Sequence, residues 1–163
     1  MIIRKEHPGD EAAIRTVVSA AFASAPNIAD LVDRLRARGD SEISLVAVEQ
    51  GEIIGHVMFS RMRADLRALG LAPLAVHPAH QRRGIGSLLV SEGLEYAAGA
   101  FWEIVFVLGD PAYYTRFGFD VSLARGFTSP YAGEHFMARA LGKTLRVTSG
   151  KVDYPSAFAE FGA

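Results

Sequence analysis

The sequence contains no cysteine among its 163 residues. Disulfide bonds, thiolate metal sites and a cysteine nucleophile are therefore excluded, and we expect a cytoplasmic protein. No apolar run approaches the roughly 20 residues that a membrane-spanning helix needs, so no membrane association is expected. Because the formal net charge is −1, the chain has no broad positive field, which argues against nucleic-acid binding.

Several familiar site motifs are also missing. The five histidines are scattered, no HExxH is present and the acidic residues do not cluster, so no metal site is expected. No GxSxG elbow marks a serine hydrolase. The triplet Gly142–Lys143–Thr144 resembles the end of a P-loop, but Met137 stands where that motif needs glycine. A dinucleotide fingerprint is only weakly supported, because Leu89 replaces its third glycine and Glu103 begins rather than ends the next strand.

Half of the residues are hydrophobic, which allows one well-packed domain over residues 1–163. Apolar spacing predicts helices over 10–21, 27–38 and 84–96, and a short helix over 112–117. It predicts strands or extended segments at 2–3, 44–49, 53–61, 69–76, 102–108, 119–121 and 136–141, and an extended tail before a last short helix. Gln50 and Gly51 predict an antiparallel hairpin. The strand–helix–strand unit over 69–108 predicts a parallel pair.

The chain is organised around LAVHPAHQRRGIGSLL, residues 74–89. Its first residues end a buried strand, and Gly84 and Gly86 then open a helix whose first N–H groups have no intrahelical partner. Glycine lets an anion approach the backbone closely, and Arg82 and Arg83 add positive charge, so a diphosphate is the expected guest. The alternative is that the two glycines only permit tight packing and the arginines are a solvated turn.

Two motifs carry a family resemblance. QRRGIG follows LAVHP, and AYYTRFGF spans residues 112–119. With them the chain resembles the GNAT superfamily of N-acetyltransferases, and GDPAYYTRFGF and YPSAF are most similar to its YhbS-like branch. The resemblance implies an α/β fold with a central mixed, mostly antiparallel sheet flanked by helices. Its fourth and fifth strands would be a parallel pair that splays apart, with the pantetheine arm of acetyl-CoA in the gap.

The resemblance also implies a site. Backbone groups of Leu74, Ala75 and Val76 would pair with the pantetheine arm, and the Val76 amide would stabilise the oxyanion. The pyrophosphate would lie on the amides of Arg82, Arg83, Gly84, Ile85, Gly86 and Ser87. Tyr114 stands four residues before the glycine of the GF pair and would protonate the leaving thiolate, with Tyr113 as the alternative. Asp110 occupies a position where family members carry an amide that contacts the cofactor.

His56 is the first candidate for the general base, because it interrupts an otherwise apolar strand. A packed histidine is the alternative, and His77, Glu42, Asp110 or a water relay remain open for the same role. The expected reaction is acetyl transfer from acetyl-CoA to a primary amine by direct attack, with an acceptor site built from 23–28, 56–61 and the region after Phe119. A non-catalytic acyl-CoA sensor is the alternative function, and the resemblance allows a homodimer.

Overall fold

The computed structural model describes residues 1–161, and a six-stranded mixed sheet with the order β1-β2-β3-β4-β5-β7 forms its centre. Its strands are β1 (Ile2–Lys5), β2 (Ser41–Glu49), β3 (Glu52–Arg61), β4 (Ala68–Val76), β5 (Ile104–Leu108) and β7 (Phe136–Ala140). The short strands β6 (Phe127–Thr128) and β8 (Gly150–Lys151) form a second, parallel sheet. Within the large sheet β4 and β5 are parallel and the other neighbouring pairs are antiparallel, which confirms the expected fold class.

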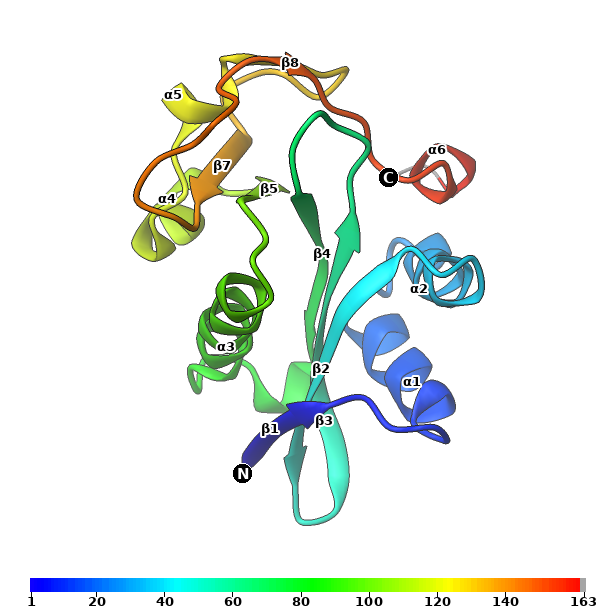
Figure 1. Cartoon of the computed structure of the whole chain (residues 1–163). Helices are drawn as coiled ribbons and strands as arrows, with labels where there is room; N and C mark the ends of the chain where they lie inside the picture. The colour runs from blue at the N-terminus through cyan, green and yellow to red at the C-terminus, as the bar shows by residue number, and fades with distance from the viewer. Residues whose placement is uncertain (162–163) are drawn as a thin grey trace.

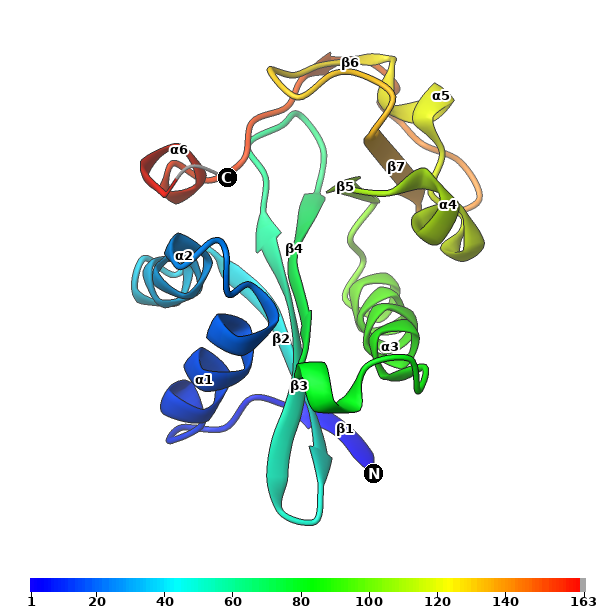
Figure 2. The same ribbon diagram turned by 180° about the vertical axis from the view of Figure 1, so that it is seen from behind.

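The helices cover the large sheet on both faces (Figures 1 and 2). One face carries α1 (Glu11–Ala21) and α2 (Asn27–Ala37), with α6 (Ala157–Glu160) beside α2. The other carries α3 (Ile85–Gly99), α4 (Pro111–Tyr114) and the 3₁₀ turns η1 (Pro78–His80) and η2 (Thr115–Phe117), and α5 (Val121–Ala124) contacts β7. Each face has its own buried apolar cluster. Among residues 1–161, no helix combines the length and the apolar character needed to cross a membrane.

Local turn chemistry explains most of the element boundaries. Gln50 and Gly51 both adopt positive φ, 51° and 77°, which is the conformation that a tight β2–β3 hairpin requires, so that prediction is confirmed. The expectation of an extended segment over 119–121 is wrong beyond Asp120. The carboxylate of Asp120 accepts a hydrogen bond from the N–H of Ser122 at 2.7 Å and thereby starts α5.

The parallel ladder between β4 and β5 is short. It joins Ala68 with Ile104, Leu69 with Val105 and Gly70 with Phe106, and then stops. β4 continues to Val76 and β5 to Leu108 without further pairing to each other, while β3 and β7 pair along their outer sides. The two neighbouring strands therefore diverge after Gly70, as expected for a splayed pair, and leave backbone groups of both strands without ladder partners.

Candidate active site

The end of β4 directs polar backbone groups toward the side that β5 has left. The N–H of His77 donates to the carbonyl of Ile54 in β3 at 2.9 Å. Since consecutive residues of a strand alternate the direction of their backbone groups, the N–H and carbonyl of Val76 point away from β3. Gln81 donates from Nε2 to that carbonyl at 3.0 Å and thereby ties the loop after η1 to the end of the strand.

The entrance to α3 carries a run of unpaired backbone amides. Within the described residues, none of the N–H groups from Arg82 to Ser87 donates to a protein acceptor, and the first helical bond formed here runs from Leu88 to the carbonyl of Gly84. Gly84 is exposed at a φ of 79°, and no heavy atom lies within 4 Å of the position its Cβ would take. The start of the helix therefore offers open space and several aligned donors, an arrangement suited to a diphosphate.

The two arginines before this helix have different environments. Arg83 is held by Glu49 of β2 and by Nδ1 of His80, 2.8 Å away. Arg82 has a positive φ of 65° and forms no ion pair with residues 1–161. Its exposed guanidinium is thus the free positive charge at the helix entrance, whereas the charge of Arg83 is already partnered.

The structure separates the two adjacent tyrosines of α4. The hydroxyl of Tyr113 lies 3.3 Å from Oγ of Ser87 and would lie 3.2 Å from a Cβ at Gly86, so Tyr113 reaches the start of α3. Tyr114 packs over Gly109 at the end of β5, where an added Cβ would come within 2.5 Å of its ring. Burial, followed by the proximity of Tyr113, raises the pKa of Tyr114 to about 12.

Three further candidates have local structural partners. The carboxylate of Asp110 accepts a hydrogen bond from the N–H of Ala112 at 3.0 Å and so caps α4. Nδ1 of His77 accepts one from the N–H of Ala79 at 3.1 Å, and Glu42 pairs with Arg61 at 2.8 Å. These contacts account for the placement of all three side chains without a role in catalysis.

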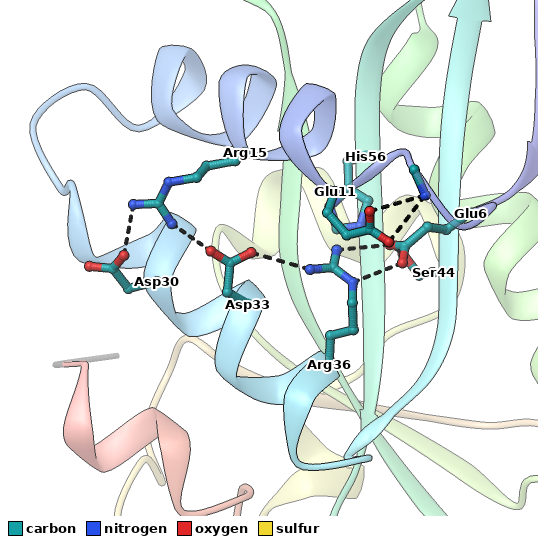
Figure 3. A network of polar contacts seen from close by, with 9 residues as sticks. Glu6, Glu11, Arg15, Asp30, Asp33, Arg36, Ser44 and His56 are labelled. Carbon is teal, nitrogen blue, oxygen red and sulfur yellow. Dashed lines mark hydrogen bonds and ion pairs between the residues drawn. The ribbon is translucent and has the colours of Figure 1, made fainter.

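His56 lies on the α1–α2 face, inside a polar network that reaches the surface (Figure 3). Its Nε2 is 2.9 Å from Oγ of Ser44, which donates to Glu6 at 2.8 Å. Glu6 accepts two hydrogen bonds from Arg36, at 2.8 and 2.9 Å. Beyond Arg36 the network continues through Asp33, Arg15 and Asp30.

The imidazole of His56 is completely buried, and its Nδ1 has no partner among residues 1–161. Burial lowers its pKa to about 4, with a smaller opposing effect from Glu6 and a reinforcing one from Arg36. Burial would raise the pKa of Glu6, but the hydrogen bonds from Arg36 and Ser44 outweigh it and the pKa is lowered. The structure thus gives His56 a neutral, enclosed position one strand away from the β4–β5 divergence.

The predicted acceptor segments come together only in part. Phe22 and Ile28, at the two ends of the α1–α2 connection, and Tyr131, after β6, all pack against the apolar cluster that contains Met58 of β3. Sequence reasoning assigned no site role to Tyr154 of the C-terminal tail, which the structure brings against Gly70. Within residues 1–161 no group of three or more histidine, cysteine, aspartate or glutamate side chains is arranged to hold a metal ion.

Comparison with known proteins agrees with this geometry. Residues 12–119 match the model of the acetyltransferase (GNAT) family. The chain belongs to this family and is an acyltransferase of the N-acetyltransferase class.

Two relatives are similar over nearly their whole length. An uncharacterised N-acetyltransferase of Escherichia coli K12, YhbS, is 34% identical and aligns over 99% of this chain and 100% of its own length. The crystal structure of E. coli YhbS in complex with CoA superposes with a TM-score of 0.91, covering 99% of this chain and 93% of that one. A GNAT acetyltransferase from Brucella melitensis, crystallised with acetyl-CoA, is 38% identical and superposes with a TM-score of 0.83, covering 96% and 97% of the two chains.

Proposed function

We propose that this protein transfers the acetyl group of acetyl-CoA to a primary amine of an acceptor molecule by direct attack. The observation that carries the proposal is the run of unpaired amides from Arg82 to Ser87, which lies directly after the strand that diverges from β5. Relatives at 34% and 38% identity were crystallised with CoA and acetyl-CoA, which supports the same cofactor here.

In this proposal the cofactor replaces a missing stretch of strand. Its pantetheine arm hydrogen-bonds with the backbone of Leu74 and Val76, in the manner of an added β-strand, while the backbone groups of Ala75 between them face β3. The pyrophosphate accepts hydrogen bonds from the amides of residues 82–87, and the free guanidinium of Arg82 adds a charge-assisted contact. Asp110 contributes indirectly, because it caps the helix that carries both tyrosines.

The proposed chemistry needs a neutral amine. Its nitrogen lone pair attacks the thioester carbon and forms the C–N bond, and a backbone N–H of β4 that faces the gap stabilises the resulting oxyanion. Collapse of this intermediate breaks the C–S bond. Tyr114 keeps its proton at neutral pH because its pKa is about 12, and it gives that proton to the departing sulfur, whose own proton affinity rises in the same low-dielectric site.

Water is the proposed carrier for the proton that the attacking amine loses. His77, Glu42 and Asp110 each have a structural partner, and His56 is enclosed on the α1–α2 face. The ammonium of the intermediate is strongly acidic, so water accepts its proton readily and returns it to Tyr114. The overall reaction then releases the amide and the free thiol of CoA.

Thermal unfolding with acetyl-CoA tests the cofactor site. A ligand present at about a hundredfold its Kd should raise the Tm by roughly 5–10 °C. Gly84→Val places a branched side chain at the anion site and should abolish this rise. Gly39→Val is the matched control, because Gly39 has a similar φ of 74° and equally open surroundings but lies after α2. Absence of a rise for the unmodified protein, or an equal rise for the Gly84 variant, would contradict the proposal.

Turnover distinguishes the enzyme from a binding module that only senses acyl-CoA. Hydroxylamine is a suitable acceptor because it is small and largely unprotonated at neutral pH. Acetohydroxamate and free thiol should form together at a rate well above the uncatalysed one. Binding of acetyl-CoA without any such turnover would instead favour the sensor.

A further inference from the structure

The C-terminal tail is fixed to the connection between β3 and β4 directly before Tyr154. Asp153 and Arg63 exchange two backbone hydrogen bonds, at 2.8 and 3.0 Å, and the guanidinium of Arg63 donates to the carbonyl of Tyr154 at 3.2 Å. Tyr154 is only 8% exposed, and its ring packs with those of Tyr131 and Phe158 at centroid distances of 5.3 and 4.7 Å. These contacts hold the side chain in one orientation.

The ring of Tyr154 covers the point where β4 and β5 diverge. A Cβ built on Gly70 would come within 2.6 Å of Cε1 of Tyr154 and 2.9 Å of the sulfur of Met62. Gly70, paired with Phe106, is the last β4 residue in the parallel ladder. The absence of a side chain at Gly70 therefore allows the phenol to lie directly on the backbone at the apex of the divergence.

Two tyrosines lie along the diverging strands on opposite faces of the sheet, Tyr154 over Gly70 and Tyr114 over Gly109. Tyr154 belongs to the apolar cluster on the α1–α2 face, whereas Tyr114 packs against the cluster beneath α3. Among the described residues, neither hydroxyl forms a hydrogen bond. Burial, followed by the hydroxyls of Tyr131 and Tyr114, raises the pKa of Tyr154. The phenol is thus neutral at physiological pH.

We propose that Tyr154 is a positioning residue for the acceptor, and that an uncharged primary amine reaches the apex from the α1–α2 face and donates a hydrogen bond to the Tyr154 hydroxyl. This inference rests on the acetyl transfer proposed above. The contact orients the nitrogen lone pair toward the thioester carbon, while Tyr114 donates its proton to the sulfur from the other face. The C–N bond forms and the C–S bond breaks as before, and Tyr154 neither gains nor loses its proton.

The surroundings of Tyr154 explain why the amine must be neutral. Its ring packs with the rings of Tyr131 and Phe158, and Met62 belongs to the same buried apolar cluster. Asp153, the adjacent acidic residue, lies 3.7 Å from the ammonium of Lys151 in an ion pair. An ammonium ion entering this apolar region would lose its hydration without a carboxylate to replace it, so the amine is expected to lose its proton before it arrives.

Tyr154→Phe tests this assignment because it keeps the ring and removes only the hydroxyl. With hydroxylamine as acceptor, we expect kcat/KM for hydroxylamine to fall about tenfold, the effect of one lost hydrogen bond. The Kd for acetyl-CoA, measured by calorimetry, should stay within about twofold of the unmodified value. Tyr96→Phe, on the exposed surface of α3, is the control and should change neither quantity.

The possible outcomes separate this inference from the cofactor proposal. Unchanged kcat/KM in Tyr154→Phe, or an equal loss of acetyl-CoA affinity and of turnover, would overturn the positioning role. Binding of acetyl-CoA by the unmodified protein without formation of acetohydroxamate would also overturn it, while leaving the cofactor site intact. If the unmodified protein does not bind acetyl-CoA, the proposed function itself fails.

Discussion

The hydroxyl of Tyr113 lies 3.3 Å from Oγ of Ser87, so this tyrosine spans from α4 to the first turn of α3. Its neighbour Tyr114 instead covers Gly109 and packs against Phe119 at a centroid distance of 5.8 Å. Two residues adjacent in the sequence thus face different parts of the proposed site, Tyr113 its diphosphate end and Tyr114 its thiol end.

The two tyrosines should therefore respond differently to removal of the hydroxyl. Tyr114→Phe is expected to lower kcat about a hundredfold, the usual contribution of a proton donor. Tyr113→Phe should leave kcat within about threefold and change mainly the KM for acetyl-CoA, because it removes one neutral hydrogen bond beside the amides. Steady-state kinetics with acetyl-CoA and hydroxylamine measure both. The reverse pattern would assign the proton donor to Tyr113.

Gly109 should be essential for the position of Tyr114. An alanine methyl at this position would lie 2.5 Å from the tyrosine ring, closer than any stable contact, so the ring must move. Gly109→Ala is expected to lower kcat about tenfold or more while binding acetyl-CoA within about threefold, since the amides of α3 are untouched. Gly99→Ala, which meets no atom within 4 Å, is the control. Normal turnover in Gly109→Ala would argue against the role of Tyr114.

Replacing Arg82 with glycine should have opposite effects on stability and affinity. The positive φ of Arg82, 65°, is unfavourable for any residue with a Cβ, so glycine should maintain the free energy of unfolding or raise it by up to about 1 kcal/mol. Loss of the guanidinium should weaken acetyl-CoA binding about five- to tenfold at low salt. Urea unfolding measures the free energy of unfolding, and calorimetry measures the Kd for acetyl-CoA.

Gln50→Gly offers a matched control for Arg82→Gly. Gln50 has a φ of 51° in the β2–β3 hairpin, on a residue outside the site. The Gln50→Gly variant should show the same small effect on the free energy of unfolding and no change in the affinity for acetyl-CoA. An Arg82→Gly variant that binds acetyl-CoA as tightly as the unmodified protein would exclude a phosphate contact.

His56 should make the fold sensitive to acid. Its folded-state pKa of about 4 lies below the ordinary value of 6.5, so the unfolded chain binds more protons between these pH values and stability falls as pH drops through that window. The loss between pH 7 and pH 5 should be about 2 kcal/mol. Glu6, whose pKa is lowered from 4.5, contributes mainly below that value.

His56→Gln keeps a polar partner for Ser44 and removes the titrating group. We expect the free energy of unfolding from urea titrations to vary much less between pH 7 and pH 5 in this variant. A variant with the same acid sensitivity as the unmodified protein would show that another group is responsible.

The central part of the fold could be predicted from sequence because its signals are local. The apolar run before Pro78 and the glycines at 84 and 86 fix a strand end and a helix start within a few residues of each other, and the structure has both. The same holds for the hairpin at Gln50 and Gly51. The extended segment expected after Phe119 was wrong because a single capping carboxylate, Asp120, outweighed a weak apolar alternation.

The side-chain environment of the candidate site depends on distant residues and could not be predicted. His56 is linked through Ser44 of β2 to Glu6, before α1, and from there to Arg36 of α2. Because these partners are distant in the sequence, the burial of His56 could not be predicted from it. The assignment of Tyr113 and Tyr114 required knowing which of them faces Ser87. The tail motif around Tyr154 is visible in the sequence, but its contact with Gly70 arises only when the tail folds back on β4.

The brevity of the β4–β5 ladder has a mechanical consequence. Only three residue pairs join strands β1, β2, β3 and β4 to strands β5 and β7. The β4–β5 pair is therefore expected to be the weakest pairing in the sheet. A ligand arm that forms hydrogen bonds with β4 beyond Gly70 would fill the gap between β4 and β5 and strengthen their connection. Backbone amide hydrogens on both sides of the β4–β5 pair should then exchange more slowly after acetyl-CoA is added. The bound donor substrate would in this way stabilise the sheet of the enzyme that uses it.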